Sequence, residues 1–175
     1  MFYIYKMNIK YVLDIIGTTA PYSLFIISIF LLRNLKNYLF FYIFGFIINN
    51  ILNIILKILI KEPRPNNDKI FFELMISNGK RIGYDNYGMP SGHAQNCLFS
   101  LAYIILTLNQ PTIGLFYIII TSISLIQRYE YKNHSIIQLI IGSIIGILFA
   151  YFVYFISTKY VIGKINNKKD DGFFG

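Results

Sequence analysis

Apolar residues run through this chain in long blocks that short polar segments interrupt. A helix that crosses a bilayer needs about 20 mostly apolar residues, and five blocks reach or approach that length. The third and fourth blocks are short, so we expect their helices to extend a turn beyond the apolar residues. The pattern predicts an all-α integral membrane protein with about five transmembrane helices in a bundle. The predicted spans are residues 11–32, 38–60, 94–108, 113–127 and 135–156.

Counting the crossings places most of the polar sequence on one side of the membrane. The end of span two, the start of span three, the end of span four and the start of span five all emerge there, with the connecting segments 61–93 and 128–134. The other side receives only segments 33–37 and 109–112 and the C-terminal tail. We therefore expect a functional site at one membrane face.

Polar side chains inside the spans favour the same face. In spans two and three they recur three and four residues apart, so each set lies on one side of its helix. Strongly polar groups at membrane depth are costly and usually face a cavity or one another. Hydrogen bonding between helices explains single residues better than it explains polar faces that converge. The two sets are Asn50, Asn53 and Lys57, then His93, Asn96 and Ser100.

Composition agrees with a membrane protein. Charged residues make up 14% of the chain, whereas a soluble domain carries about 25%. The net charge of +8 could indicate a nucleic-acid partner, but the basic residues fall between apolar blocks, as loop charge does. We expect one transmembrane domain over residues 1–156, with its core at 50–142, and a polar tail over 157–175. No nucleic acid and no obligatory protein partner is inferred.

The end of span two carries two cations. Lys57 is followed by Arg64 and Pro65 in "KILIKEPRP". Two cations that meet at a helix end suit an anion, and the planar fork of arginine suits phosphate in particular. Basic residues that simply mark the lipid interface are the alternative.

Span three begins with "PSGH", residues 90–93. Proline and serine are favoured at helix starts, and Gly92 lets the backbone approach a ligand closely. The first N–H groups of a helix form an anion site, which Ser91 and His93 would flank. An ordinary N-cap beside an interfacial histidine is the alternative.

The third group joins spans four and five. Arg128 ends one span, His134 opens the next, and Gln138 lies one turn beyond His134 on the same face. A histidine with a partner on one nitrogen and a free second nitrogen is typical of an oriented nucleophile or base.

Together the three groups resemble the signature of the phosphatidic acid phosphatase type 2 / haloperoxidase superfamily. The resemblance implies that His134 attacks phosphorus to form a phosphohistidine and that His93 protonates the leaving group. It implies no cofactor and no metal, because cations and a helix N-terminus can stabilise a phosphoryl group by charge and position. The residues that match are Lys57-x6-Arg64-Pro65, Pro90-Ser91-Gly92-His93 and Arg128-x5-His134. The phosphate-binding residues implied are Lys57, Arg64, Ser91, Gly92 and Arg128.

Two positions depart from the family pattern. Gln127 stands where a serine usually precedes the arginine, and Gln138 stands where an aspartate usually orients the nucleophilic histidine. We expect the Gln138 amide oxygen to accept the imidazole N–H, although an amide stabilises an imidazolium less than a carboxylate does. Dolichyl diphosphatases, a branch of this superfamily, are similar in having this glutamine and "GMPS-x-H-x-Q", which matches "GMPSGHAQ" including Gln95.

These features predict a membrane-embedded diphosphatase that converts a polyprenyl, dolichyl-type diphosphate to the monophosphate plus phosphate. A phosphatase of phosphatidate or another lipid monophosphate is one alternative. A catalytically weak lipid-binding protein of the same fold is another. The density of Lys and Arg in the short loops predicts a cytosolic tail and a lumenal or extracytoplasmic site. With the resemblance to dolichyl diphosphatases, we expect the membrane to be that of the endoplasmic reticulum, with the site facing the lumen, and a bacterial inner membrane is the alternative location.

Overall fold

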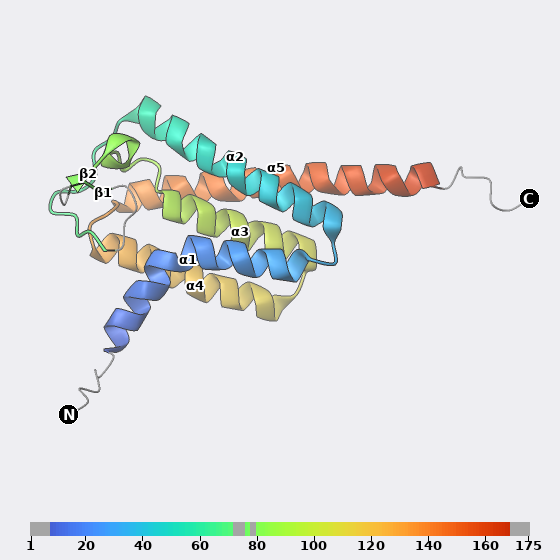
Figure 1. Ribbon diagram of the computed structural model, residues 1–175, viewed down its shortest axis with the longest axis horizontal. Coiled ribbons are helices and arrows are strands. Elements are labelled where there is room, and N and C mark those ends of the chain that lie inside the picture. The colour runs from blue at the N-terminus through green and yellow to red at the C-terminus, as the bar shows by residue number, and fades with distance from the viewer. Residues whose placement is uncertain (1–7, 72–75, 78–79, 169–175) are drawn as a thin grey trace, which may run out of the picture.

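A computed structural model describes residues 8–71, 76–77 and 80–168, which form a helical bundle (Figure 1). Four of its helices are long and apolar enough to cross a membrane, which confirms the predicted all-α membrane class. A two-stranded antiparallel hairpin and a short 3₁₀ helix, η1, lie between α2 and α3. The elements are α1 (Ile9–Leu32), α2 (Lys36–Ile60), β1 (Ile76–Ser77), β2 (Lys80–Arg81), η1 (Gly83–Asn86), α3 (Gly92–Leu108), α4 (Pro111–Glu130) and α5 (Ile136–Lys168).

Helix α3 is the central helix of the bundle. It contacts all four of the other helices, and it is the only one of the five described helices too short for the span criterion, with 17 residues. Its burial explains its composition, because a helix surrounded by protein needs no apolar face toward lipid. Polar residues on α3 can therefore form hydrogen bonds inside the bundle without meeting the bilayer.

Two glycines allow α5 to pack closely on α3. A Cβ at Gly142 would lie 2.5 Å from the carbonyl oxygen of Ser91, and a Cβ at Gly146 would collide with the carbonyl of Gln95. Small residues four apart commonly let membrane helices approach in this way. The close contact brings the start of α5 against the start of α3, which is where the two histidines lie.

The helix ends meet as the crossing count predicts. The end of α2, the start of α3, the end of α4 and the start of α5 gather at the end of the bundle that carries the hairpin and η1 (Figure 1). Helix α5 continues to Lys168, so the predicted polar tail that starts at residue 157 is helical in its first part. This stretch contains no proline to end the helix.

Helix α1 bends in its middle (Figure 1). Pro21 lies inside this helix, and a proline in a helix removes one N–H and displaces the carbonyl four residues earlier. That carbonyl belongs to Gly17, and it accepts a hydrogen bond from Ser124 Oγ on α4 at 2.7 Å. The bend therefore exposes backbone oxygens of α1 toward α3 and α4.

Candidate active site

A cavity of about 210 Å³ opens at the end of the bundle where the helix ends meet. This is smaller than pockets that enclose a whole drug-sized ligand, which are about 300–1,000 Å³, so it suits a head group better than a lipid chain. Its apolar wall is formed by Pro21, Tyr22, Phe46 and Ile54. Six of the eight predicted site residues line it, namely Lys57, Arg64, Gly92, His93, Arg128 and His134.

The two ring nitrogens of His134 have different partners. Nδ1 lies 2.9 Å from the carbonyl oxygen of Gly88, and Nε2 lies 3.2 Å from Nη1 of Arg64. Since a carbonyl can only accept, Nδ1 carries the hydrogen and Nε2 keeps its lone pair. Of the two nitrogens, Nε2 is therefore the one with a lone pair that could attack a ligand.

The environment of His134 favours the neutral ring. Burial lowers the pKa of His134 well below its ordinary value of 6.5, and the nearby cations, Arg64 first and then Lys57, lower this pKa further. Both causes act in the same direction because each disfavours a positive charge on the imidazole. Nε2 is thus unprotonated at neutral pH, and its lone pair accepts from Arg64 in this structure.

Gln138 does not take the role expected from the sequence. Its side-chain nitrogen donates to Glu62 Oε1 at 2.8 Å and to the carbonyl of Pro63 at 2.9 Å, while its oxygen accepts from the backbone N–H of Ser135 at 3.2 Å. The acceptor that orients His134 is instead a backbone carbonyl. The predicted hydrogen bond from the His134 imidazole to the Gln138 oxygen is wrong, because the Gln138 amide turns toward the segment that follows α2.

Gln138 and Glu62 together fix the position of the Gly88 carbonyl. The N–H of Gly88 donates to the backbone carbonyl of Glu62 at 2.8 Å, and the backbone carbonyl of Gln138 accepts from the N–H of Ser91 at 3.1 Å. A Cβ at Gly88 would collide with the Gln138 side chain, so only glycine allows this approach. We call Glu62, Gly88 and Gln138 the backbone clamp, because they join the segments that carry all three motifs.

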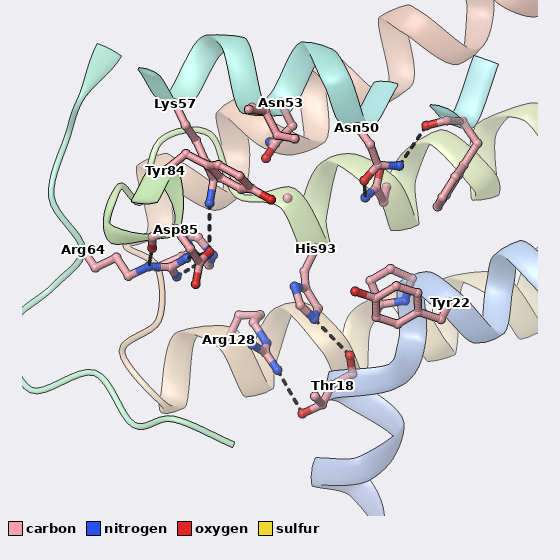
Figure 2. Close-up of a pocket in the computed structure, with 16 residues that line it drawn as sticks. Thr18, Tyr22, Asn50, Asn53, Lys57, Arg64, Tyr84, Asp85, His93 and Arg128 are labelled. Carbon is pink, nitrogen blue, oxygen red and sulfur yellow. Dashed lines mark hydrogen bonds and ion pairs between the residues drawn. The ribbon is translucent and has the colours of Figure 1, made fainter. Parts of the chain in front are cut away.

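His93 is oriented by helix α1. Its Nε2 lies 3.0 Å from the carbonyl oxygen of Thr18, next to the bend at Pro21. Because that carbonyl can only accept, Nε2 carries a hydrogen. The other ring nitrogen, Nδ1, faces the cavity (Figure 2). A proton delivered to a ligand would therefore come from Nδ1 of the doubly protonated ring, and Nδ1 of the neutral ring could accept one.

Arg128 is held by Gln127 and Thr18. Its Nε donates to Gln127 Oε1 at 2.9 Å, and its Nη2 donates to Thr18 Oγ1 at 2.9 Å. The Gln127 amide nitrogen also donates to Thr18 Oγ1 at 2.8 Å. Gln127, which departs from the family pattern, thus fastens the arginine to α1, and Gly17 provides the space because a Cβ there would lie 2.9 Å from Gln127 Cβ.

Lys57 and Arg64 approach each other around an acidic residue, Asp85 of η1 (Figure 2). The Asp85 carboxylate lies 2.7 Å from Arg64 Nη2 and 3.4 Å from Lys57 Nζ. Burial alone would raise the pKa of Asp85, but the neighbouring cations, Arg64 first, outweigh it and hold this pKa below its ordinary value. The carboxyl group is therefore ionised at neutral pH.

The start of α3 has the predicted cap. Ser91 is the N-cap residue, and its hydroxyl accepts from the N–H of Ala94 at 3.4 Å. Ser91 is fully buried behind the cavity, whereas Gly92 lines it. The structure thus places Gly92 to contact a ligand and Ser91 to shape the helix start.

Gln95 lies in a buried network of amides between α2 and α3. It donates to the side-chain oxygen of Asn49 at 2.9 Å and accepts from Asn53 at 2.8 Å. Asn96 continues the network by donating to Asn50 at 2.8 Å. The polar faces found in the sequence thus serve partly to join two helices, and Gln95 supports the site from outside the cavity.

Sequence reasoning missed two residues of the site. Thr18 lies far from the motifs in sequence, and the only signal for it is Pro21 three residues later, which predicts exposed carbonyls. Asp85 gives no periodic signal, because it belongs to a long connecting segment. Among the described residues, no group of three or more His, Cys, Asp or Glu side chains could hold a metal ion.

One comparison with known proteins identifies a relationship. A family model described as the PAP2 superfamily matches residues 38–161. This range contains all three motifs, helices α3 and α4, and most of α2 and α5. Comparisons with curated proteins and with solved structures give no match.

Proposed function

Because the chain belongs to the PAP2 superfamily, whose members are phosphatases, we propose that it hydrolyses a lipid diphosphate through a phosphohistidine at His134. The observation that carries this proposal is the neutral imidazole of His134, with Nδ1 donating to a backbone carbonyl and Nε2 beside Arg64 at the cavity. An oriented nucleophile next to a cation is the arrangement that covalent phosphoryl transfer needs.

In the first step, the Nε2 lone pair of His134 attacks the terminal phosphorus. The bond between phosphorus and the bridging oxygen breaks, and that oxygen leaves with the bonding electrons. It takes the Nδ1 proton of His93, which has to enter this step as an imidazolium with a hydrogen on each ring nitrogen, a charge that the bound diphosphate anion favours. In the second step, His93 takes a proton from water while the water oxygen attacks phosphorus. The P–N bond breaks, its electrons return to Nε2, and inorganic phosphate is released.

Three cations stabilise the phosphoryl group during both steps. Lys57, Arg64 and Arg128 line the cavity from α2, the following segment and α4. Charge spreads over the equatorial oxygens in the transition state of phosphoryl transfer, and fixed cations lower its energy more than they lower that of the ground state. The N-terminus of α3 at Gly92 adds the positive end of a helix dipole.

The neutral acceptor on His134 favours a diphosphate substrate. A carboxylate would stabilise the imidazolium character that His134 gains during attack, and a backbone carbonyl does so less. A less activated nucleophile needs a better leaving group, and a lipid phosphate leaves more readily than a lipid alkoxide. We therefore favour a polyprenyl, dolichyl-type diphosphate over phosphatidate, with the monophosphate as the lipid product. The density of Lys and Arg in the short loops separately favours a site on the lumenal side, which for such a substrate would be that of the endoplasmic reticulum.

The test is phosphate release by the purified protein in detergent, with chelator present. Prenyl diphosphate, prenyl monophosphate and phosphatidate are compared, with His134→Ala as the control. We expect the highest kcat/KM for the diphosphate and no release by His134→Ala. Equal rates on diphosphate and phosphatidate would reject the diphosphate preference, release unchanged in His134→Ala would reject the mechanism, and no release from any lipid would favour a lipid-binding protein.

A further inference from the structure

One oxygen of the Asp85 carboxylate pairs with the cations of the cavity, and the other pairs with a cation outside it. Oδ1 contacts Arg64 and Lys57 at 2.7 and 3.4 Å, and Oδ2 lies 2.6 Å from Nη1 of Arg81. Arg81 also donates to Asp68 at 2.7 Å. The Asp85 carboxylate thus lies between Lys57 and Arg64, the two cations that would bind a phosphate. If these two cations bound a phosphate instead, Asp85 would still have Arg81 as a partner.

Arg64 is bound both to Asp85 and to the nucleophile. Its Nε donates to the backbone carbonyl of Asp85 at 2.8 Å, and its Nη1 donates to the carbonyl of Asn133 at 2.8 Å. The same Nη1 lies 3.2 Å from Nε2 of His134. An N–H donated to Nε2 occupies the lone pair that attacks phosphorus, so Arg64 has to move off this nitrogen before the reaction.

Burial explains why Lys57 and Arg64 need an anion between them. The side chains of Lys57 and Arg64 are 5% and 8% exposed, and that of Asp85 is 15% exposed. Two cations of like charge in such an environment are costly unless an anion compensates them. A ligand phosphate would supply the same compensation through the same donors.

We propose that Asp85 occupies the place of the substrate phosphate until substrate binds and that only a phosphoryl group with two or more negative charges displaces it. Displacement transfers Lys57 and Arg64 to the phosphate, draws Arg64 away from Nε2 of His134, and leaves Asp85 paired with Arg81. This inference rests on the proposed function, and it makes Asp85 a specificity-determining residue of that site.

The charge requirement separates the substrate from the lipids around it. A phosphodiester head group carries a single negative charge, the same as the Asp85 carboxylate, so it gains little by replacing an anion that is already positioned. A phosphate monoester or a terminal diphosphate carries more charge and more acceptor oxygens, and charge-assisted hydrogen bonds to arginine are correspondingly stronger. Bulk phosphodiester lipids would thus be excluded although they surround the site.

The test compares Asp85→Asn with Asp68→Asn, which removes a partner of Arg81 without touching Lys57 or Arg64. The probe is inorganic phosphate, and its binding to the detergent-solubilised protein is measured by calorimetry. We expect the Kd for phosphate to fall about tenfold or more in Asp85→Asn, which corresponds to about 1.4 kcal/mol, and to stay within about twofold in Asp68→Asn. An unchanged or higher Kd in folded Asp85→Asn would overturn the proposal.

A second readout concerns selectivity. We expect phosphatidylglycerol in mixed micelles to inhibit Asp85→Asn competitively and to leave the parent protein unaffected, while the KM for prenyl diphosphate falls without a rise in kcat. A merely structural role of Asp85 would raise KM and would create no new inhibitor. That outcome would contradict the proposal.

The parent protein provides a measurement that does not depend on any variant folding. Hydrogen exchange at the amides of residues 83–86 is followed with and without inorganic phosphate. Displacement of Asp85 predicts faster exchange in η1 when phosphate binds, and unchanged or slower exchange would contradict it. Neither binding nor exchange requires turnover, so this outcome is independent of whether the proposed hydrolysis is correct.

Discussion

Nδ1 of His134 lies 2.9 Å from the carbonyl oxygen of Gly88, so a backbone atom orients the proposed nucleophile. In the family pattern a side-chain carboxylate at the position of Gln138 has this role. Here the side chain at that position holds the backbone in place through Glu62 and Pro63. The Gly88 carbonyl thus fixes the orientation and tautomer of the His134 ring without placing a negative charge beside it, as a carboxylate would.

The variant Gln138→Glu distinguishes two roles for this side chain. It could hold the backbone clamp together, or it could accept the His134 N–H as the family aspartate does. If the residue acted as an acceptor for His134, a carboxylate would preserve or raise activity. In the clamp, glutamate loses both donated hydrogen bonds and places its charge against Glu62, so we expect kcat to fall about 10–100-fold, as for other groups that support a catalytic ligand. The measurement is phosphate release from prenyl diphosphate, and undiminished kcat would reject the clamp.

The double variant Glu62→Gln with Gln138→Glu provides the matched control. Exchanging donor and acceptor restores the hydrogen bond between the two side chains but not the one to the Pro63 carbonyl. We therefore expect partial recovery of kcat relative to Gln138→Glu alone, measured as a double-mutant cycle. Strictly additive losses would show that the two side chains do not act together.

Pro21→Ala tests the link between the bend in α1 and His93. Alanine restores an N–H to the helix, which straightens α1 and withdraws the Thr18 carbonyl from His93. General acid catalysis contributes about 10²–10⁴-fold, and we expect a loss of about tenfold in kcat. Phosphatidate turnover should fall more than diphosphate turnover, because an alkoxide needs the proton more.

Thr19→Ala is the control for that variant, since the Thr19 hydroxyl is exposed and bonds only within α1, to the carbonyl of Ile15 at 2.8 Å. We expect its kcat to match that of the parent protein. Equal losses on both substrates in Pro21→Ala would show that the bend does not act through the leaving group.

The lowered pKa of His134 predicts how stability depends on pH. An unfolded histidine has a pKa of about 6.5, whereas burial, with Arg64 and Lys57, lowers the folded value well below it. Below about pH 6.5 the unfolded chain therefore binds a proton that the folded protein does not, and stability falls as pH drops, by up to about 1.4 kcal/mol per pH unit.

The measurement is the free energy of unfolding in detergent at about pH 7.5 and about pH 5.5 for the parent protein and His134→Gln. Other titrating groups are common to both proteins, so the difference isolates His134. We expect a smaller loss of stability on acidification in the variant. The same loss in both proteins would mean that His134 titrates normally in the folded state.

Much of the fold follows from the sequence because apolar blocks determine membrane helices. The five helices, four of them long and apolar enough to cross a membrane, and the gathering of four helix ends at one face depend only on block length and on counting crossings. The boundaries were less predictable. Helix α5 continues to Lys168, since a helix that leaves the apolar core needs no further apolar residues and the sequence there gives no stop signal.

The site also has a part that the sequence predicts and a part that it does not. Lys57, Arg64, His93, Arg128 and His134 stand in motifs near helix ends, so sequence order alone brings them to one face. Contacts that depend on backbone paths could not be predicted. The Thr18 carbonyl requires the bend at Pro21, and the turn of Gln138 away from His134 requires the position of Glu62, which no periodicity encodes.

The phosphorylated nitrogen tests the central claim most directly. The protein is mixed briefly with prenyl diphosphate and denatured at alkaline pH, where phosphohistidine is preserved, and the labelled residue and ring nitrogen are identified by mass spectrometry and ³¹P NMR. The hydrogen on Nδ1 that His134 donates to Gly88 predicts phosphate on Nε2 of His134. Phosphate on Nδ1, phosphate on His93, or turnover without any phosphohistidine would contradict the account.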